Sequence, residues 1–113
     1  ALTAADYVNA QRTRRRLVAQ LRAAVADVDV LVLPTTRLRA TPIGAESVDV
    51  DGTAVAVRPA LLALTLPFNL AGWPAVSVPG PVGAGELPGG VQVVGVRLEE
   101  RGVLRVAGAI VGE

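Results

Sequence analysis

The chain of 113 residues contains no histidine and no cysteine, and all 11 of its basic residues are arginine. A serine nucleophile needs a neighbouring base, usually histidine or lysine, to accept its proton. Arginine does not lose its proton in proteins, so it cannot replace them. The absence of cysteine also excludes disulfides and thiolate metal sites. We therefore predict no catalytic residue, no metal site and no cofactor here, and no hydrolytic activity of the chain alone.

Aromatic residues are scarce as well, with one Phe, one Trp and one Tyr. Arginines concentrate in segment 12–16, but 11 basic residues face 10 acidic ones, and no aromatic side chain is interleaved with the arginines. This balance argues against a nucleic-acid partner. No apolar run approaches the roughly 18 residues of a membrane span, and no signal-peptide pattern is present. We therefore expect no membrane partner and a cytoplasmic location.

The first 26 residues predict a helix. Thr3 followed three residues later by Asp6 is typical of a helix start, and apolar residues then recur at helical spacing. Arg14 falls inside the apolar stripe formed by Tyr7, Ala10, Leu17, Val18, Leu21 and Val25. A guanidinium there is costly to desolvate unless it pairs with an anion or with carbonyl oxygens. Arg14 is thus a candidate substrate contact, with a structural pair or a snorkelled surface arginine as the alternatives.

Three segments predict core strands. Val28–Leu33 is continuously apolar, which is typical of a strand covered on both faces. Ala75–Val78 is bounded by prolines, and Val91–Val96 carries Gln92 as its one polar member. We interpret Gln92 as a hydrogen-bonding sheet residue rather than a ligand contact.

Shorter elements connect these strands. Asp51-Gly52 lies between two alternating segments and predicts a tight hairpin. Pro59 predicts the start of a short helix over Ala60–Leu66, apolar nearly all round and therefore buried. The prolines of Pro67–Trp73 predict a loop leading into the strand that follows. Glu99–Val111 predicts a closing helix with one apolar side. Together these elements predict an α/β fold, a mixed β-sheet with packed helices, in a single domain.

Two motifs carry a resemblance to a known family. Asn-Leu-Ala-Gly-Trp-Pro-Ala-Val-Ser-Val-Pro-Gly (69–80) and Leu-Pro-Gly-Gly-Val-Gln-Val-Val-Gly (87–95) resemble the C-terminal region of the amidase signature family. The segments 7–17 and 29–36 agree with it in order and spacing. The resemblance covers essentially all of this chain but only roughly the last quarter of a family member. It implies that residues 1–113 form the C-terminal segment of an amidase-type domain, which is incomplete without its partner half.

The resemblance also implies roles for individual residues. Family members cleave amides with a Ser nucleophile, a second Ser in a cis peptide and a Lys, all upstream of the region matched here, so no catalytic residue can be assigned. In the tRNA-dependent glutamine amidotransferase members, an arginine on the first helix grips the substrate carboxylate, and Arg14 matches it. Those members carry an aspartate for the substrate amine where this chain has Leu62. Leu62 therefore favours an uncharged or apolar amide.

Three functions remain open from the sequence. The leading one is the non-catalytic C-terminal portion of an amidase, which acts on a small amide substrate and whose partner is the remaining catalytic part. The second is a stand-alone structural or binding domain with an amidase-like fold, as a monomer or homo-oligomer. The third is the amidase-like subunit of a tRNA-dependent glutamine amidotransferase, which Leu62 disfavours.

Overall fold

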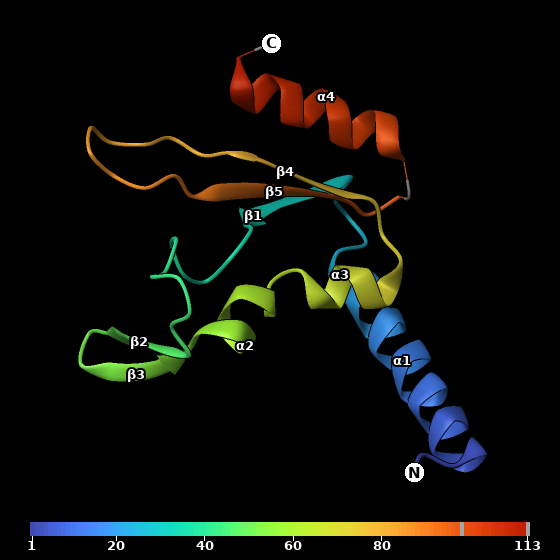
Figure 1. Cartoon of the computed structure of the whole chain (residues 1–113). Coiled ribbons are helices and arrows are strands. Elements are labelled where there is room, and N and C mark those ends of the chain that lie inside the picture. The colour runs from blue at the N-terminus through green and yellow to red at the C-terminus, as the bar shows by residue number, and fades with distance from the viewer. Residues whose placement is uncertain (98, 113) are drawn as a thin grey trace.

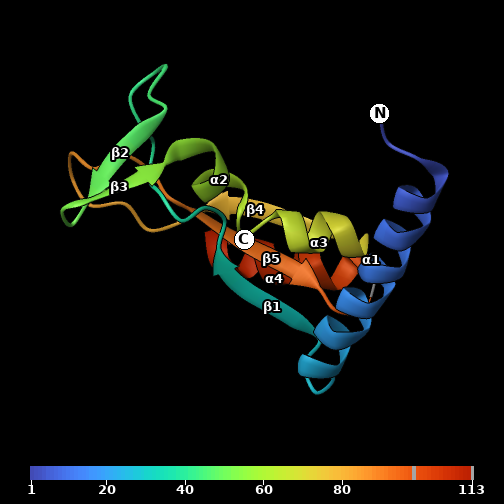
Figure 2. The ribbon, with the colours of Figure 1, turned by 90° about the horizontal axis from the view of Figure 1, so that it is seen from below.

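The computed structural model describes residues 1–97 and 99–112 (Figure 1). Its centre is a three-stranded sheet in which each neighbouring pair is antiparallel. In spatial order, the strands are β1 (Val30–Pro34), β5 (Gly90–Gly95) and β4 (Ala75–Pro79). Helix α4 (Glu100–Val111) covers one face, while α1 (Ala4–Ala24) and α3 (Leu66–Ala71) lie on the other (Figures 1 and 2). The predicted α/β fold is confirmed.

Two small cores lie on opposite faces of the central strand β5. Val93 is fully buried on the α4 side, where it packs with Val103 and Ala107. Its neighbour Val94 is fully buried on the other side, in the cluster with Phe68 and Trp73. Successive side chains of a strand point to opposite faces, so these adjacent valines join both helical layers to one strand.

Strand β1 shows that the sheet is only partly covered. Leu31 and Leu33 pack on the Phe68–Trp73 cluster, and Val30 packs on the α4 side. Val32, however, keeps 54% of its surface exposed. The prediction of a strand covered on both faces therefore holds for part of β1 only.

The predicted hairpin is confirmed. Strands β2 (Ser47–Val50) and β3 (Thr53–Ala56) pair antiparallel in a separate two-stranded sheet. The two turn residues, Asp51 and Gly52, have φ angles of 50° and 81°. Both positive angles match the right-handed twist of the strands, which is why Asp-Gly is favoured there.

The prediction of one buried helix over Ala60–Leu66, followed by a loop, is wrong. The chain forms two short helices, α2 (Val57–Leu62) and α3 (Leu66–Ala71), separated by a turn. Pro67 lies in the first turn of α3, where a missing N–H is tolerated because no intrahelical acceptor is available. Only Val57 and Ala60 of α2 are buried. Leu62 and Leu66 keep 39% and 52% of their surface exposed.

Helix α3 ends in a tight backbone turn at Gly72. Gly72 has a φ of 73° and donates its N–H to the Asn69 carbonyl at 3.3 Å, while Trp73 donates to the Phe68 carbonyl at 3.1 Å. This pair of bonds defines a Schellman motif, which commonly brings together side chains on either side of the turn. Here the rings of Phe68 and Trp73 stack with centroids 6.1 Å apart. The turn thus forms half of the core beneath the sheet.

Helix α1 begins as predicted but lies mostly outside the core. Thr3 Oγ1 accepts a hydrogen bond from the Asp6 N–H, and the Asp6 carboxylate accepts one from the Thr3 N–H, which completes a capping box. No residue of α1 is buried, although Leu21 packs on the Phe68–Trp73 cluster. The N-terminal half of the helix projects away from the sheet (Figures 1 and 2).

The surface is large for the mass of the chain. The accessible area is 8172 Å², whereas a compact monomer of this mass exposes about 5,800 Å². The radius of gyration is 16.8 Å, against about 13 Å for a compact domain of this length. The surplus of roughly 2,300 Å² is of the size that an obligate interface covers. None of the described helices combines the length and apolar character needed to cross a bilayer.

The capping box predicts a pH dependence for the start of α1. Hydrogen bonds from the Thr3 backbone N–H, and secondarily from its hydroxyl, hold the pKa of Asp6 below its ordinary value of 3.8. A depressed pKa in the folded state stabilises the helix above the unfolded value, and this contribution is lost as the pH falls below 3.8 through the folded pKa. NMR titration of the Asp6 carboxyl should show the lowered pKa. Thr3→Ala should raise it only part of the way, since the backbone donor remains.

The left-handed turn predicts opposite effects for two glycine substitutions. Gly72→Ala should lower the free energy of unfolding by about 1–2 kcal/mol, because a Cβ is unfavourable at positive φ. Gly102→Ala, inside α4 and not at positive φ, should raise it by up to about 1 kcal/mol, since alanine favours helix. Urea denaturation measures both. Equal effects of the two substitutions would contradict the role assigned to the turn.

Candidate functional site

Arg14 connects α1 to the end of α3. Its side chain is half-buried, and its Nε donates to the Leu70 carbonyl at 2.6 Å. The carbonyl groups in the last turn of a helix have no partner within the helix, so an arginine from a neighbouring element can satisfy one of them. The guanidinium therefore does not point freely into solvent, as a snorkelled surface arginine would.

A shallow cavity of about 350 Å³ lies beside Arg14. Its lining consists of Arg14, Arg15, Val18, Ala19, Arg22 and Ala71. Beyond Nε, the guanidinium of Arg14 makes no hydrogen bond within residues 1–97 and 99–112, so its terminal nitrogens keep donor capacity. Three arginines around one cavity favour an anionic or strongly polar group over an apolar one.

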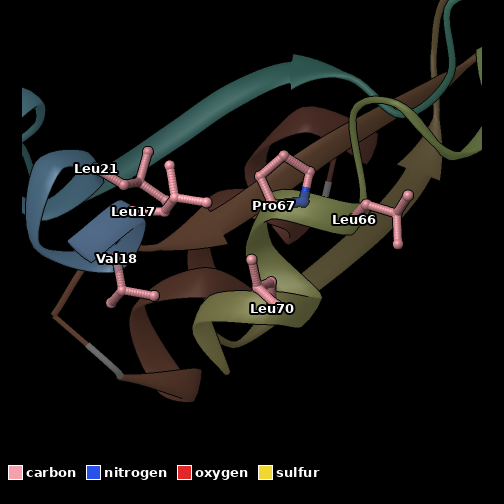
Figure 3. A pocket seen from close by; sticks show the side chains of 6 residues that line it. All are labelled: Leu17, Val18, Leu21, Leu66, Pro67 and Leu70. Carbon is pink, nitrogen blue, oxygen red and sulfur yellow. The ribbon is translucent and has the colours of Figure 1, made fainter. Parts of the chain in front are cut away.

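An apolar groove of about 480 Å³ lies next to this cavity, between α1 and α3 (Figure 3). Its six lining residues are Leu17, Val18 and Leu21 of α1 and Leu66, Pro67 and Leu70 of α3. Leu70 serves both sites, because its carbonyl binds Arg14 and its side chain lines the groove. The apolar stripe predicted for the first helix is thus largely a groove wall rather than core.

Leu62 lines neither the groove nor the Arg14 cavity. It lies at the end of α2, and its carbonyl accepts hydrogen bonds from the N–H and hydroxyl of Thr65. The structure therefore does not bring Leu62 and Arg14 together around either of these cavities.

A third concavity, of about 370 Å³, is polar and opens on the sheet face near α3. Residues from β4, β5, α3 and the adjoining turns line it: Thr35, Thr65, Asn69, Ala75, Val76, Ser77 and Gln92. The hydroxyls of Thr35 and Ser77 are 2.6 Å apart. Gln92 is 3% exposed, and its Nε2 donates to the Leu64 carbonyl at 3.1 Å. Gln92 thus forms the structural hydrogen bond that the sequence favoured, although to a turn rather than to the sheet.

Sequence reasoning missed the hydroxyls of this concavity. Ser77 lies directly across from Gln92 in the β4–β5 register, and Thr35 immediately follows the end of β1. Two positions apart on a strand share one face, so the alternation of Ala75 and Ser77 places Ser77 on this side. The alternation is visible in the sequence, but the strand register that brings Thr35 alongside is not.

The chemistry available at these sites is binding rather than bond cleavage. Ser77 Oγ has only the Thr35 hydroxyl as a hydrogen-bond partner among the described residues, and a hydroxyl does not activate a serine nucleophile. The hydrogen bond and charge of Arg39 lower the pKa of Glu86, but this carboxyl is exposed and lines none of the three cavities.

Comparison with known proteins places this fold and these motifs in one class. The sequence pattern of the Amidase family matches residues 1–104, so the chain belongs to the amidase family. It is 40% identical, over 96% of its length, to fatty acid amide hydrolase of Medicago truncatula. It is also 40% identical, over 94% of its length, to the glutamyl-tRNA(Gln) amidotransferase subunit of Rickettsia bellii. The family resemblance seen in the sequence is confirmed.

A solved structure supports the same assignment. The fold superimposes on the crystal structure of an amidase with a TM-score of 0.84 and 39% sequence identity, covering 95% of this chain. The chain spans 18% of the Medicago protein, 20% of the Rickettsia protein and 24% of the solved amidase. It thus corresponds to about a fifth of the length of these relatives.

The Arg14–Leu70 contact predicts a stability difference between two neighbouring arginines. Arg14→Ala should lower the free energy of unfolding by about 1 kcal/mol, because it removes a charge-assisted hydrogen bond between α1 and α3. Arg16→Ala, on the exposed side of the same helix, should change it by less than about 0.5 kcal/mol. Urea denaturation of the two variants provides the measurement, and a comparable loss in both would contradict the connecting role of Arg14.

Proposed function

We propose that this chain is the C-terminal portion of an amidase that hydrolyses carboxylic amide C–N bonds, with its catalytic residues supplied by the rest of the enzyme. Its family membership and its similarity to amide hydrolases support the activity. The chain has no lysine, histidine or cysteine, so the proton acceptor that a serine nucleophile requires must come from elsewhere. Residues 1–113 are then one incomplete domain, and the proposed location is the cytoplasm.

The partner that this proposal requires is the remaining four-fifths of the amidase. The exposed surface supports it, because the chain exposes 8172 Å², roughly 2,300 Å² more than a compact monomer of its mass. Part of this surplus is the apolar groove between α1 and α3, whose Leu17 and Leu70 are 46% and 42% exposed. A large exposed apolar groove is typical of a surface that another part of a protein covers.

The proposed substrate is a small uncharged or apolar amide. Leu62 supplies no charge for a substrate amine, and this argues against glutamine. Arg14 would contribute to the pocket wall through the terminal nitrogens of its guanidinium, beside the cavity that it lines with Arg15 and Arg22. An amide that places a polar or anionic group there and an apolar group toward Leu17 and Leu70 fits both neighbouring surfaces.

A second candidate is the amidase-like subunit of a tRNA-dependent glutamine amidotransferase. The identity of 40% to the Rickettsia bellii protein favours it, whereas Leu62 disfavours it. A stand-alone binding domain, as a monomer or a homo-oligomer, has less support, because it leaves the surplus surface uncovered unless a second copy packs on it.

A segment exchange tests the proposed function. The solved amidase that is 39% identical to this chain is expressed with its matching segment replaced by residues 1–113. The exchanged enzyme should hydrolyse a fatty acyl amide, because this chain supplies the missing strands and the α1–α3 groove. The chain alone should neither release product nor become labelled by a fluorophosphonate, a serine-reactive probe. Labelling of the isolated chain, or a folded but inactive exchanged enzyme, would overturn the proposal.

The role of Arg14 is tested in the exchanged enzyme. Arg14→Ala should raise KM about tenfold or more with a smaller change in kcat, since one charged hydrogen bond to substrate is removed. Arg16→Ala, on the same helix, should leave both unchanged. Added guanidinium ion should partly restore the KM of the Arg14 variant. A KM equal to that of the parent, in a variant that still folds, would exclude contact between Arg14 and the substrate.

A further inference from the structure

The polar concavity beside α3 has a donor and an acceptor that the described residues leave unused. Thr35 and Ser77 together carry two hydroxyl protons, and their 2.6 Å contact uses one of them. The remaining hydroxyl proton can be donated to a ligand. Gln92 uses its Nε2 on the Leu64 carbonyl, while its Oε1 accepts no hydrogen bond within the described residues. One donor and one acceptor therefore lie on residues that line the same concavity.

The strand register holds these groups close together. Ser77 and Gln92 are paired directly across β4 and β5, so their Cβ atoms are about 5 Å apart on one face. Thr35 lies next to Ser77, because its N–H donates to the Gly90 carbonyl at 2.9 Å. The donor and the acceptor are thus fixed by sheet pairing rather than by a flexible loop.

Gly90 makes room for the hydroxyl pair. A Cβ at this position would lie 2.6 Å from Thr35 Oγ1 and 2.8 Å from Ser77 Oγ, closer than side chains tolerate. Gly90 has no positive φ that would call for glycine on backbone grounds. The absent side chain is therefore explained by the space that the two hydroxyls occupy.

Among the described residues, the lining contains no ionisable side chain: its polar members are two threonines, one serine, one asparagine and one glutamine. A charged ligand would lose hydration without gaining an opposite charge. A neutral group that accepts one hydrogen bond and donates another is matched instead. A carboxamide has this pair of functions on adjacent atoms.

We propose that this concavity binds a neutral carboxamide group. Its carbonyl oxygen accepts from the Thr35–Ser77 hydroxyl pair, and its N–H donates to Gln92 Oε1. The amide belongs either to a substrate or to a backbone peptide of the enzyme's remaining part. The inference deepens the proposed function, on which it rests only for the substrate source.

The binding chemistry is tested on this chain by NMR titration with acetamide, and with acetate as a charged molecule of the same shape. Acetamide should produce saturable shifts at Ser77, Asn69 and the Gln92 side-chain amide, with a dissociation constant of roughly tens of millimolar, as expected for so small a ligand. Acetate should produce none there. Shifts that grow linearly for both compounds would overturn the proposal.

Substitutions assign the shifts to the concavity. Ser77→Ala and Thr35→Val should each weaken acetamide binding about threefold to tenfold, the worth of one hydrogen bond. Gly90→Ala should weaken it as well by crowding the hydroxyls. Ser47→Ala, in the distant hairpin, is the matched control and should leave binding unchanged. Unaltered binding in folded Ser77→Ala and Thr35→Val would overturn the site, and preserved amide-signal dispersion identifies folded variants.

The exchanged enzyme separates the two sources of the amide. If the substrate occupies the concavity, Ser77→Ala raises KM with thermal stability unchanged. If a backbone peptide occupies it, Ser77→Ala lowers thermal stability and leaves KM unchanged. If Ser77→Ala alters neither quantity, the concavity has no amide in the assembled enzyme and the proposal is overturned. An inactive exchanged enzyme alongside saturable acetamide binding would reject the proposed function and keep the site.

Discussion

The left-handed turn at Gly72 is the constraint on which most of this structure depends. It reverses the chain over one residue, so that Trp73 stacks on Phe68 and both rings reach Val94 in the central strand. The same turn fixes where α3 ends and therefore where the Leu70 carbonyl meets Arg14. It also directs the chain straight into β4, which carries Ser77. Packing, the α1 contact and the polar concavity all follow from the path of these few residues.

The three concavities share one short helix. Each is lined in part by α3 or its ends: Leu70 in the groove, Ala71 beside Arg14 and Asn69 in the polar concavity. None of their described lining residues can accept a proton from a serine. Apolar, cationic and neutral polar surfaces therefore surround α3 in a chain suited to binding, while bond cleavage is left to residues outside it. This matches an amidase portion that corresponds to about a fifth of its relatives' length.

Much of the fold can be predicted from local chemistry, but its assembly cannot. Thr3 and Asp6 predict the helix start, and Asp51-Gly52 predicts the hairpin, because each signal lies within a few residues. The loop predicted at Pro67 is wrong, since proline restricts its neighbour yet is also tolerated in the first turn of a helix.

Long-range contacts account for most of what the sequence does not reveal. Arg14 stands out in the sequence by its place in an apolar stripe, but its carbonyl partner is 56 residues away. The Thr35–Ser77 pair, 42 residues apart, depends on the same kind of long-range register. Neither distance leaves a local pattern, so the chemistry of each residue is predictable while its partner is not.

Trp73 gives the chain a built-in optical probe. It is the only tryptophan, it is 5% exposed, and it directly follows the turn that ends α3. Its indole N–H is buried without a hydrogen-bond partner in the part of the chain that the structure describes, although buried tryptophans usually have one. Indole fluorescence depends on the polarity around the ring, so the emission of this single residue responds to any displacement of α3. Assembly with a partner and occupation of the neighbouring surfaces can therefore be followed without attaching a dye.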